Sequence, residues 1–153
     1  MIQIRPYKNT DAAVFKALNI AWLEKYFYVE DYDKEVLSNP DTYILNKDGF
    51  IFMVTEENLP IGTMSLMKHE EGVYEFTKMA VDPNFQGRGI GKEMMLYCIA
   101  FAKAQQFKKV ILYSNTLLEN AIHIYRKYGF VEIPIEQDVA YERCNIKMEH
   151  TLD

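Results

Sequence analysis

Several features are scarce in this chain of 153 residues, and each scarcity excludes a class of protein. Its two cysteines, Cys98 and Cys144, are too few for the disulfide framework of a small secreted domain. The longest nearly unbroken apolar stretch, Met94 to Ala102, is far too short to span a bilayer. The first residues also lack the apolar run of a signal peptide. We therefore expect a cytoplasmic protein with no membrane partner.

Basic clusters and metal-ligand patterns are missing too. The chain has 17 Lys and Arg against 22 Asp and Glu, a net charge of −5, and no run of cations suited to binding a duplex. Its three histidines, His69, His123 and His150, are scattered without the spacing of metal ligands. We expect neither nucleic acid nor a metal ion as a partner, while a homodimer is compatible with the sequence.

Linkers and repeats are absent, and 49% of the residues are hydrophobic, which predicts a single domain over residues 1–153. Capping side chains at 9–11 predict a helix to about residue 26, followed by a short helix stopped by Asn39-Pro40. The order of the remaining elements predicts a mixed sheet with helices on both faces. Strands are expected at 2–7, 50–55, 60–67, 73–81, 109–114, 130–135 and 144–148, and helices at 11–26, 31–37, 90–107 and 117–128.

Glycine is scarce as well, yet three of the seven glycines lie two residues apart between an expected strand and an expected helix. Alternate glycines at such a junction expose backbone N–H groups beside the positive end of the helix dipole. Such a junction is a receptor for a phosphate-type anion. The glycines are Gly87, Gly89 and Gly91.

Two familiar phosphate loops do not match this junction. A nucleoside-triphosphate loop ending at Gly91-Lys92 would need Gly where Gln86 stands and Ser or Thr where Glu93 stands. A dinucleotide fingerprint starting at Gly87 or Gly89 would need a third glycine where Lys92 or Met94 stands. An unrelated nucleotide-binding protein is therefore disfavoured.

The loop instead resembles the pyrophosphate loop of the GNAT superfamily of acyl-CoA-dependent N-acyltransferases. The six residues Gln86 to Gly91 fill every required position of the family pattern. Residues 78–83 look like the family strand beside the pantetheine arm, and residues 121–130 are similar to the family helix that ends in Tyr-x-x-x-Gly-Phe. The similarity is clearest from about Gly62 to Val131.

The resemblance implies a central mixed, mostly antiparallel sheet and an N-acetyltransferase that moves an acetyl group from acetyl-CoA to a primary amine in a ternary complex. The alternative is a catalytically silent acyl-CoA-binding module of the same fold. The strand backbone would donate to the thioester carbonyl oxygen as charge develops there. The implied cofactor-binding residues are Met79, Ala80, Val81, Gln86, Gly87, Arg88, Gly89, Ile90, Gly91 and Lys92, although Arg88 and Lys92 could equally be solvated.

Tyr125 matches the proton donor of the family, four residues before Gly129, and is the candidate general acid for the leaving thiolate. A phenol has an ordinary pKa of about 10 and a thiol one of about 8.5, so Tyr125 can donate at neutral pH. The alternative is packing, since the chain has eleven tyrosines. Tyr128 is expected to pack.

Glu75 is the candidate general base, because several relatives carry a basic glutamate five residues before the position of Ala80. It would take the proton of the amine through a water molecule. The alternative is a solvated glutamate, or one paired with Lys78 or Lys68.

One position departs from the family pattern. Many relatives carry a pantetheine-binding asparagine where this chain has Leu118, and we expect Asn115 to replace it, with Asn120 as the other asparagine available. A turn or helix-capping asparagine is the alternative role for Asn115. Cys98 would carry an acyl group only in a ping-pong scheme, and its apolar helix indicates a buried, inert thiol.

The acceptor pocket is expected near the end of the first long helix, where relatives build it. Trp22 and Tyr26 share a helix face at spacing i, i+4, and core packing is the alternative role for Trp22. Tyr28 and Glu30 complete the candidate set, and the acidic pair Glu30 and Asp31 beside aromatic residues suits a cationic amine.

Overall fold

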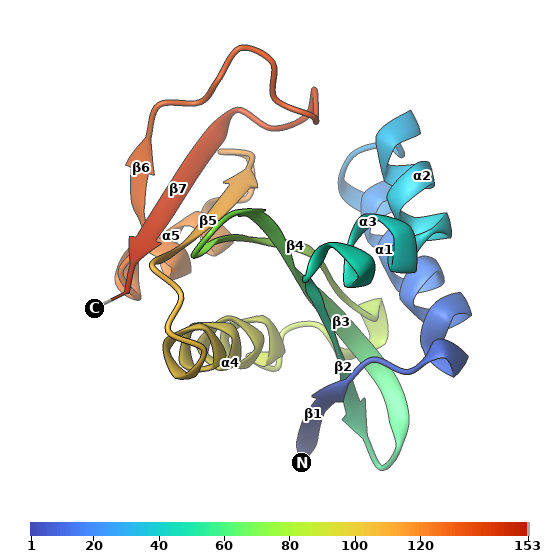
Figure 1. Ribbon diagram of the computed structural model, residues 1–153. Helices are drawn as coiled ribbons and strands as arrows, with labels where there is room; N and C mark the ends of the chain where they lie inside the picture. Colours follow the sequence, from blue (N-terminus) through green and yellow to red (C-terminus); the bar gives the residue numbers. More distant parts are fainter. Residues whose placement is uncertain (153) are drawn as a thin grey trace.

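The computed structural model describes residues 1–152 and is built on a seven-stranded sheet (Figure 1). The strand order is β1-β2-β3-β4-β5-β7-β6, and every neighbouring pair is antiparallel except β4 and β5. The predicted mixed, mostly antiparallel sheet is confirmed. The strands are β1 (Ile2–Pro6), β2 (Phe50–Glu56), β3 (Leu59–Glu70), β4 (Val73–Val81), β5 (Lys109–Ser114), β6 (Val131–Ile133) and β7 (Ile146–Thr151).

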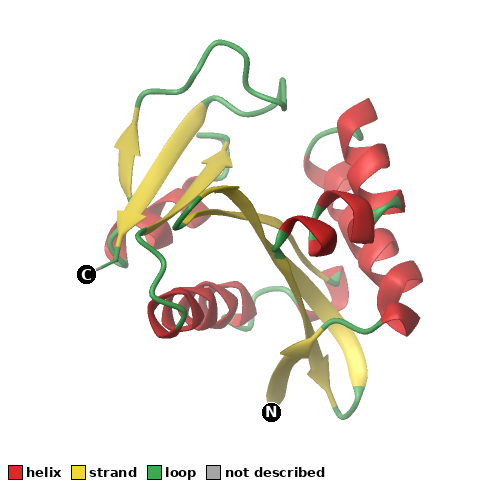
Figure 2. Ribbon diagram, in the orientation of Figure 1, coloured by secondary structure: helices red, strands yellow, loops and turns green. Residues whose placement is uncertain are grey.

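Helices cover both faces of this sheet, as predicted (Figures 1 and 2). One face carries α1 (Ala12–Tyr26), α2 (Asp31–Ser38) and α3 (Pro40–Tyr43), and the other carries α4 (Ile90–Ala104) and α5 (Glu119–Lys127). Three short 3-10 turns complete the chain: η1 (Asn9–Asp11), η2 (Leu45–Lys47) and η3 (Pro83–Phe85). Within residues 1–152, no helix combines the length and the apolar character needed to cross a membrane.

Alternation along the strands divides the apolar side chains between two cores. On β2, Phe52 and Val54 pack with α4, while Ile51 packs with Phe15 of α1 and Leu37 of α2. All five side chains are at most 3% exposed. Burial of such a side chain contributes roughly 1.5–3 kcal/mol, which fixes each helix layer on its own face.

The two parallel strands separate soon after they begin, and this separation positions the site. β4 and β5 pair only from Val73 with Lys109 to Glu75 with Ile111. Beyond Glu75, a β-bulge puts an extra residue into β4 opposite β3, and Lys78 adopts a positive φ of 52° there. Because a bulge bends its strand, β4 turns away from β5 and leaves a V-shaped opening between them.

Several predicted boundaries were wrong, and contacts made in the folded chain explain two of them. α4 ends at Ala104 and not at Phe107, because Gln106 takes a positive φ of 62° and Phe107 stacks on Tyr74 with centroids 3.8 Å apart. Residues 9–11 form the turn η1, and the Asp11 carboxylate binds Arg5 and the Lys8 N–H and does not cap α1. The expected helix 117–128 is shortened to Glu119–Lys127, and the last two strands are shifted.

Candidate active site

The glycine loop joins β4 to α4 and has the geometry of an anion receptor. Gly87 and Gly89 take positive φ values of 80° and 75°, which other residues rarely adopt. A Cβ atom built on Gly87, Gly89 or Gly91 meets no atom within 4 Å, so the backbone is open to a ligand. The N–H of Glu93 bonds to the Gly89 oxygen, and the amides before it have no partner within the helix.

The side chains of Gln86 and Arg88 in this loop form hydrogen bonds and an ion pair with other residues of the chain. Gln86 donates to the Val81 oxygen at 3.3 Å and accepts from Lys25 at 3.0 Å and from the Tyr26 hydroxyl at 3.1 Å. Arg88 forms an ion pair with Glu56 at 2.5 Å. The part of the loop that stays open is therefore its backbone, which borders a hollow of about 190 Å³.

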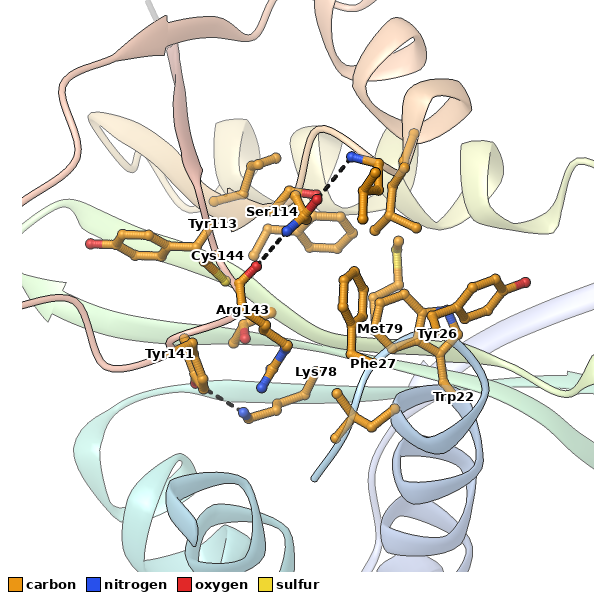
Figure 3. A pocket seen from close by; sticks show the side chains of 18 of the residues that line it. Trp22, Tyr26, Phe27, Lys78, Met79, Tyr113, Ser114, Tyr141, Arg143 and Cys144 are labelled. Atoms are coloured by element: carbon orange, nitrogen blue, oxygen red, sulfur yellow. Dashed lines mark hydrogen bonds between the residues drawn. The ribbon is translucent and has the colours of Figure 1, made fainter. Parts of the chain in front are cut away.

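A larger cavity of about 580 Å³ fills the opening between β4 and β5. Trp22 and Met79 line both this cavity and the glycine hollow, so the two spaces adjoin. Trp22, Tyr26 and Phe27 gather at one end of the cavity, and Lys78, Tyr141 and Arg143 lie at the other (Figure 3). We call these the aromatic end and the charged end.

Tyr125, on α5, lies in the wall of this cavity and is 8% exposed. Burial, with a smaller effect of Cys98, raises the pKa of Tyr125 to about 12, so the phenol stays protonated at neutral pH. Tyr128 is half-buried and packs beside the ammonium groups of Lys92 and Lys127.

Glu75 lies at the apex of the V, at the last position at which β4 pairs with β5. Its side chain also lines the cavity. It is 5% exposed, and its Oε1 lies 2.7 Å from Nε2 of His69. The sequence also allowed an ion pair of Glu75 with Lys68 or Lys78, but in the described structure both lysines pair with other carboxylates. Lys68 binds Glu71 and Asp48 at the surface, and Lys78 binds Asp33.

The charged end contains a buried ion cluster that the sequence did not predict. Lys78 donates to Asp33 at 3.2 Å and to the Tyr141 hydroxyl at 2.9 Å. Arg143 binds both oxygens of Asp33, at 2.6 and 3.1 Å, and also reaches Glu30 at 2.8 Å. The partners are between 45 and 113 positions apart, so no local pattern reveals them.

Burial and pairing shift the pKa values in this cluster in opposite directions. Burial lowers the pKa of Lys78, although Asp33 and Glu75 oppose the shift. Burial would raise the pKa of Asp33, but hydrogen bonds from Arg143 and the charge of Lys78 outweigh it and hold that pKa below its ordinary value. Asp33 therefore stays ionised at neutral pH.

The segment after α1 divides the predicted acceptor residues into two pairs. Trp22 and Tyr26 line the cavity and lie with their ring centroids 5.2 Å apart. Tyr28 and Glu30 instead bind the segment before β7: Tyr28 donates to Glu142 at 3.1 Å, and Glu30 accepts from the Glu142 N–H at 2.9 Å. Because Arg143 neutralises Glu30, this carboxylate is not available to a cationic amine.

Asn115 lines the cavity at the end of β5, and both ends of its side chain are occupied. It accepts from the Leu117 N–H at 2.8 Å and donates to the Arg143 oxygen at 2.7 Å. The bond from the Leu117 N–H is typical of an asparagine that stabilises a turn, which was the alternative role for Asn115. Leu118 and Asn120 follow in the same wall, and the predicted pantetheine contact of Asn115 stays a prediction.

The remaining reactive groups do not form a second centre. Cys98 is 2% exposed, and burial raises its thiol pKa well above the ordinary range. Cys144 lines the cavity, and burial raises its pKa to about 11. In the part of the chain that the structure describes, no group of three or more His, Cys, Asp or Glu side chains is placed to hold a metal ion.

Known proteins resemble this chain in sequence and in fold. A mycothiol acetyltransferase from Actinosynnema mirum is 30% identical over 83 residues, which are 54% of this chain and 28% of that protein. The chain spans less than half of the length of the curated relatives it matches.

Two solved structures share the whole fold. An acetyltransferase of the GNAT family from Staphylococcus aureus superposes with a TM-score of 0.87 at 19% identity, over 100% of both chains. A GNAT family acetyltransferase from Elizabethkingia anophelis with acetyl-CoA bound has a TM-score of 0.76 at 22% identity, over 99% of this chain and 98% of that one. The model of the acetyltransferase (GNAT) family matches residues 15–130, which hold the glycine loop, the V between β4 and β5, and Tyr125. The chain belongs to the GNAT family of acetyltransferases.

Proposed function

We propose that this protein is an N-acetyltransferase that moves an acetyl group from acetyl-CoA to a primary amine by direct attack in a ternary complex. Residues 1–153 would act as one catalytic domain. The observation that carries the proposal is the junction of two hollows, one at the glycine loop and one between β4 and β5, with Glu75 and Tyr125 in the wall of the second.

The donor site is proposed for residues Gln86 to Lys92. Their open backbone and the N-terminus of the 15-residue helix α4 suit the two negative charges of a pyrophosphate. Met79, Ala80 and Val81 line the adjoining hollow, which suits an extended thiol arm leading into the V. When bound, acetyl-CoA supplies an activated thioester carbonyl.

The nitrogen of the acceptor amine would lie in the V, next to Glu75. Glu75 takes the proton of the attacking amine, directly or through a water molecule, because it is a cavity carboxylate with little exposure. Among the described residues, no strand pairs with β4 on its β5 side beyond Glu75, so this backbone can donate to the carbonyl oxygen as charge develops.

Tyr125 would give its proton to the departing sulfur. Its raised pKa of about 12 keeps the proton on the phenol at neutral pH, so the hydroxyl can donate to the sulfur as negative charge develops on it. Cys98 has no part in the transfer, because its thiol is buried and its thiolate is disfavoured. Direct transfer to the amine needs no such covalent carrier.

The acceptor class is proposed as a small or protein-borne amine whose body fits the aromatic end, formed by Trp22, Tyr26 and Phe27. We also infer that the protein works in the cytoplasm, which agrees with its two free thiols.

The test is an acetyl-transfer assay with acetyl-CoA over a panel of amines that includes amino sugars, amino acids, polyamines and lysine peptides. We expect CoA release that depends on one class of amine, with a 1:1 stoichiometry of acetyl-CoA in calorimetry. Tight 1:1 binding without transfer to any amine would indicate a silent acyl-CoA-binding module. A preference for ATP or NAD would contradict the donor assignment.

A further inference from the structure

His69 lies beside the proposed base, at a second irregularity of the sheet. Lys68 pairs with Tyr74 and Glu70 with Val73, so His69 is an extra, bulged residue on β3. A bulge redirects a side chain out of the normal alternation. Here the imidazole approaches Glu75 of the neighbouring strand, with 2.7 Å between Nε2 and Oε1.

The two side chains of this pair face different surroundings. The Glu75 side chain is 6% exposed and lines the cavity, whereas the His69 side chain is 39% exposed to solvent. The pair therefore connects the interior of the site to bulk water at the apex of the V, on the side away from the glycine loop.

Charged groups from three elements surround the imidazole. Glu75 on β4 raises the pKa of His69 through its hydrogen bond, burial lowers it, Lys147 on β7 lowers it and Glu136 raises it. Lys147 and Glu136 bind each other at 3.2 Å, so they largely cancel at this distance. Glu75 is the partner that controls the protonation of His69.

A buried base must release a proton after every turnover. Loss of the amine's proton to Glu75 leaves a neutral carboxylic acid that cannot act again until it ionises. Its low exposure slows direct exchange with water, and His69 is a titratable group within hydrogen-bond distance and in contact with solvent.

We propose that His69 is the proton relay of the site and carries the proton from Glu75 to bulk solvent. The proposal rests on the proposed acetyl transfer to an amine. The O–H bond of Glu75 breaks as the Nε2 lone pair of the neutral imidazole takes the proton, which gives a carboxylate and an imidazolium. The imidazolium then loses its Nδ1 proton to water, and exchange with solvent restores the first tautomer.

Substitution His69→Gln separates this role from a structural one. The amide of glutamine can still donate a hydrogen bond to Glu75, but it cannot take up and release a proton. At low buffer concentration we expect kcat to fall by about tenfold or more with little change in the KM for acetyl-CoA. Added imidazole, which can reach the exposed position of the ring, should restore most of the loss.

The matched control is His123→Gln, since His123 is exposed on α5 and its substitution should change neither kcat nor its buffer dependence. Wild-type kcat in His69→Gln at the lowest buffer concentration would overturn the proposal. A loss that imidazole does not restore would overturn it too, because His69 would then only position Glu75.

A measurement without substrate keeps this proposal separate from the proposed function. The pKa of His69, followed by NMR of the imidazole, should fall toward about 6.5 in Glu75→Gln. An unchanged value would show that the pair does not form in solution and would overturn the relay. If the wild type transfers no acetyl group, the proposed function fails, while this titration still tests the pair.

Discussion

The two ends of the site are built in opposite ways. The proposed donor end is one continuous segment, Gln86 to Gly91, whose open backbone lies at the start of α4. The charged end collects residues from three separate parts of the chain: Glu30 and Asp33, then Lys78, then Tyr141 and Arg143. A local site can be recognised from local sequence, whereas a cluster assembled by folding cannot.

The two ends also differ in what a substitution should do. Gly91 lacks the positive φ of Gly87 and Gly89, and a Cβ built on it meets no described atom within 4 Å, so changing Gly91 should affect ligand binding and leave the fold intact. The buried charges of Asp33 and Lys78 pair with each other, and Asp33 also pairs with Arg143, so removing one of these charges should affect the fold first. Five predictions test this contrast.

The largest effect is expected from Gly91→Asp. The new carboxylate would stand against the bound pyrophosphate, and like charges in contact cost several kcal/mol, so CoA affinity should fall at least about 100-fold. Calorimetry measures the affinity, and the melting temperature should stay near that of the wild type. Gly91→Asn is the matched control of equal size, and an equal loss in both variants would mean that bulk and not charge excludes the ligand.

The next effect concerns stability at the charged end. Asp33→Asn keeps the shape but leaves the cations of Lys78 and Arg143 underpaired, which should lower the free energy of unfolding by about 3 kcal/mol. Urea denaturation measures it. Asp31→Asn on the same helix is the control, because Asp31 is exposed.

The same variant should change the pH dependence of stability. Since folding lowers the pKa of Asp33, its contribution is present above the ordinary value of about 3.9 and is lost as the pH falls through the lower, folded value. The acid loss of stability should therefore be smaller in Asp33→Asn than in the wild type. Parallel curves would contradict the assignment of Asp33 as an ionised partner.

A further test concerns Tyr125, the proposed general acid, which lies between the two ends. Tyr125→Phe keeps the ring packing and removes the hydroxyl, so kcat should fall by roughly 10²-fold while CoA affinity and fold persist. Steady-state kinetics measures the change. Tyr128→Phe should cost little, and equal, small effects in both variants would assign both tyrosines to packing.

The smallest effect is expected at the rim of the donor end. Arg88→Gln removes an exposed side chain that already binds Glu56, so CoA affinity should change less than about fivefold, and less still at high salt. Titration at two ionic strengths measures it. A loss comparable to that of Gly91→Asp would mean that side chains and not the backbone hold the phosphates.

The sequence by itself determined the parts that depend on neighbouring residues. Alternation of apolar residues predicts the range of β4. The conformational freedom of glycine predicts the positive φ values at the glycine junction and at Gly129 after α5. The family assignment rested on the same segments, and it is confirmed. Tyr125 was selected in this way, and the structure places it in the cavity wall.

Only the tertiary structure decided the parts that depend on distant residues. The stacking of Phe107 on Tyr74 set the end of α4. The charged end depends on ion pairs between residues up to 113 positions apart, and one of them pairs Glu30 with Arg143. The contact between His69 and Glu75 depends on a bulge that no residue pattern announced. The physical reason is that backbone preference acts over a few residues, whereas buried charge is stable only where folding brings its partner to it.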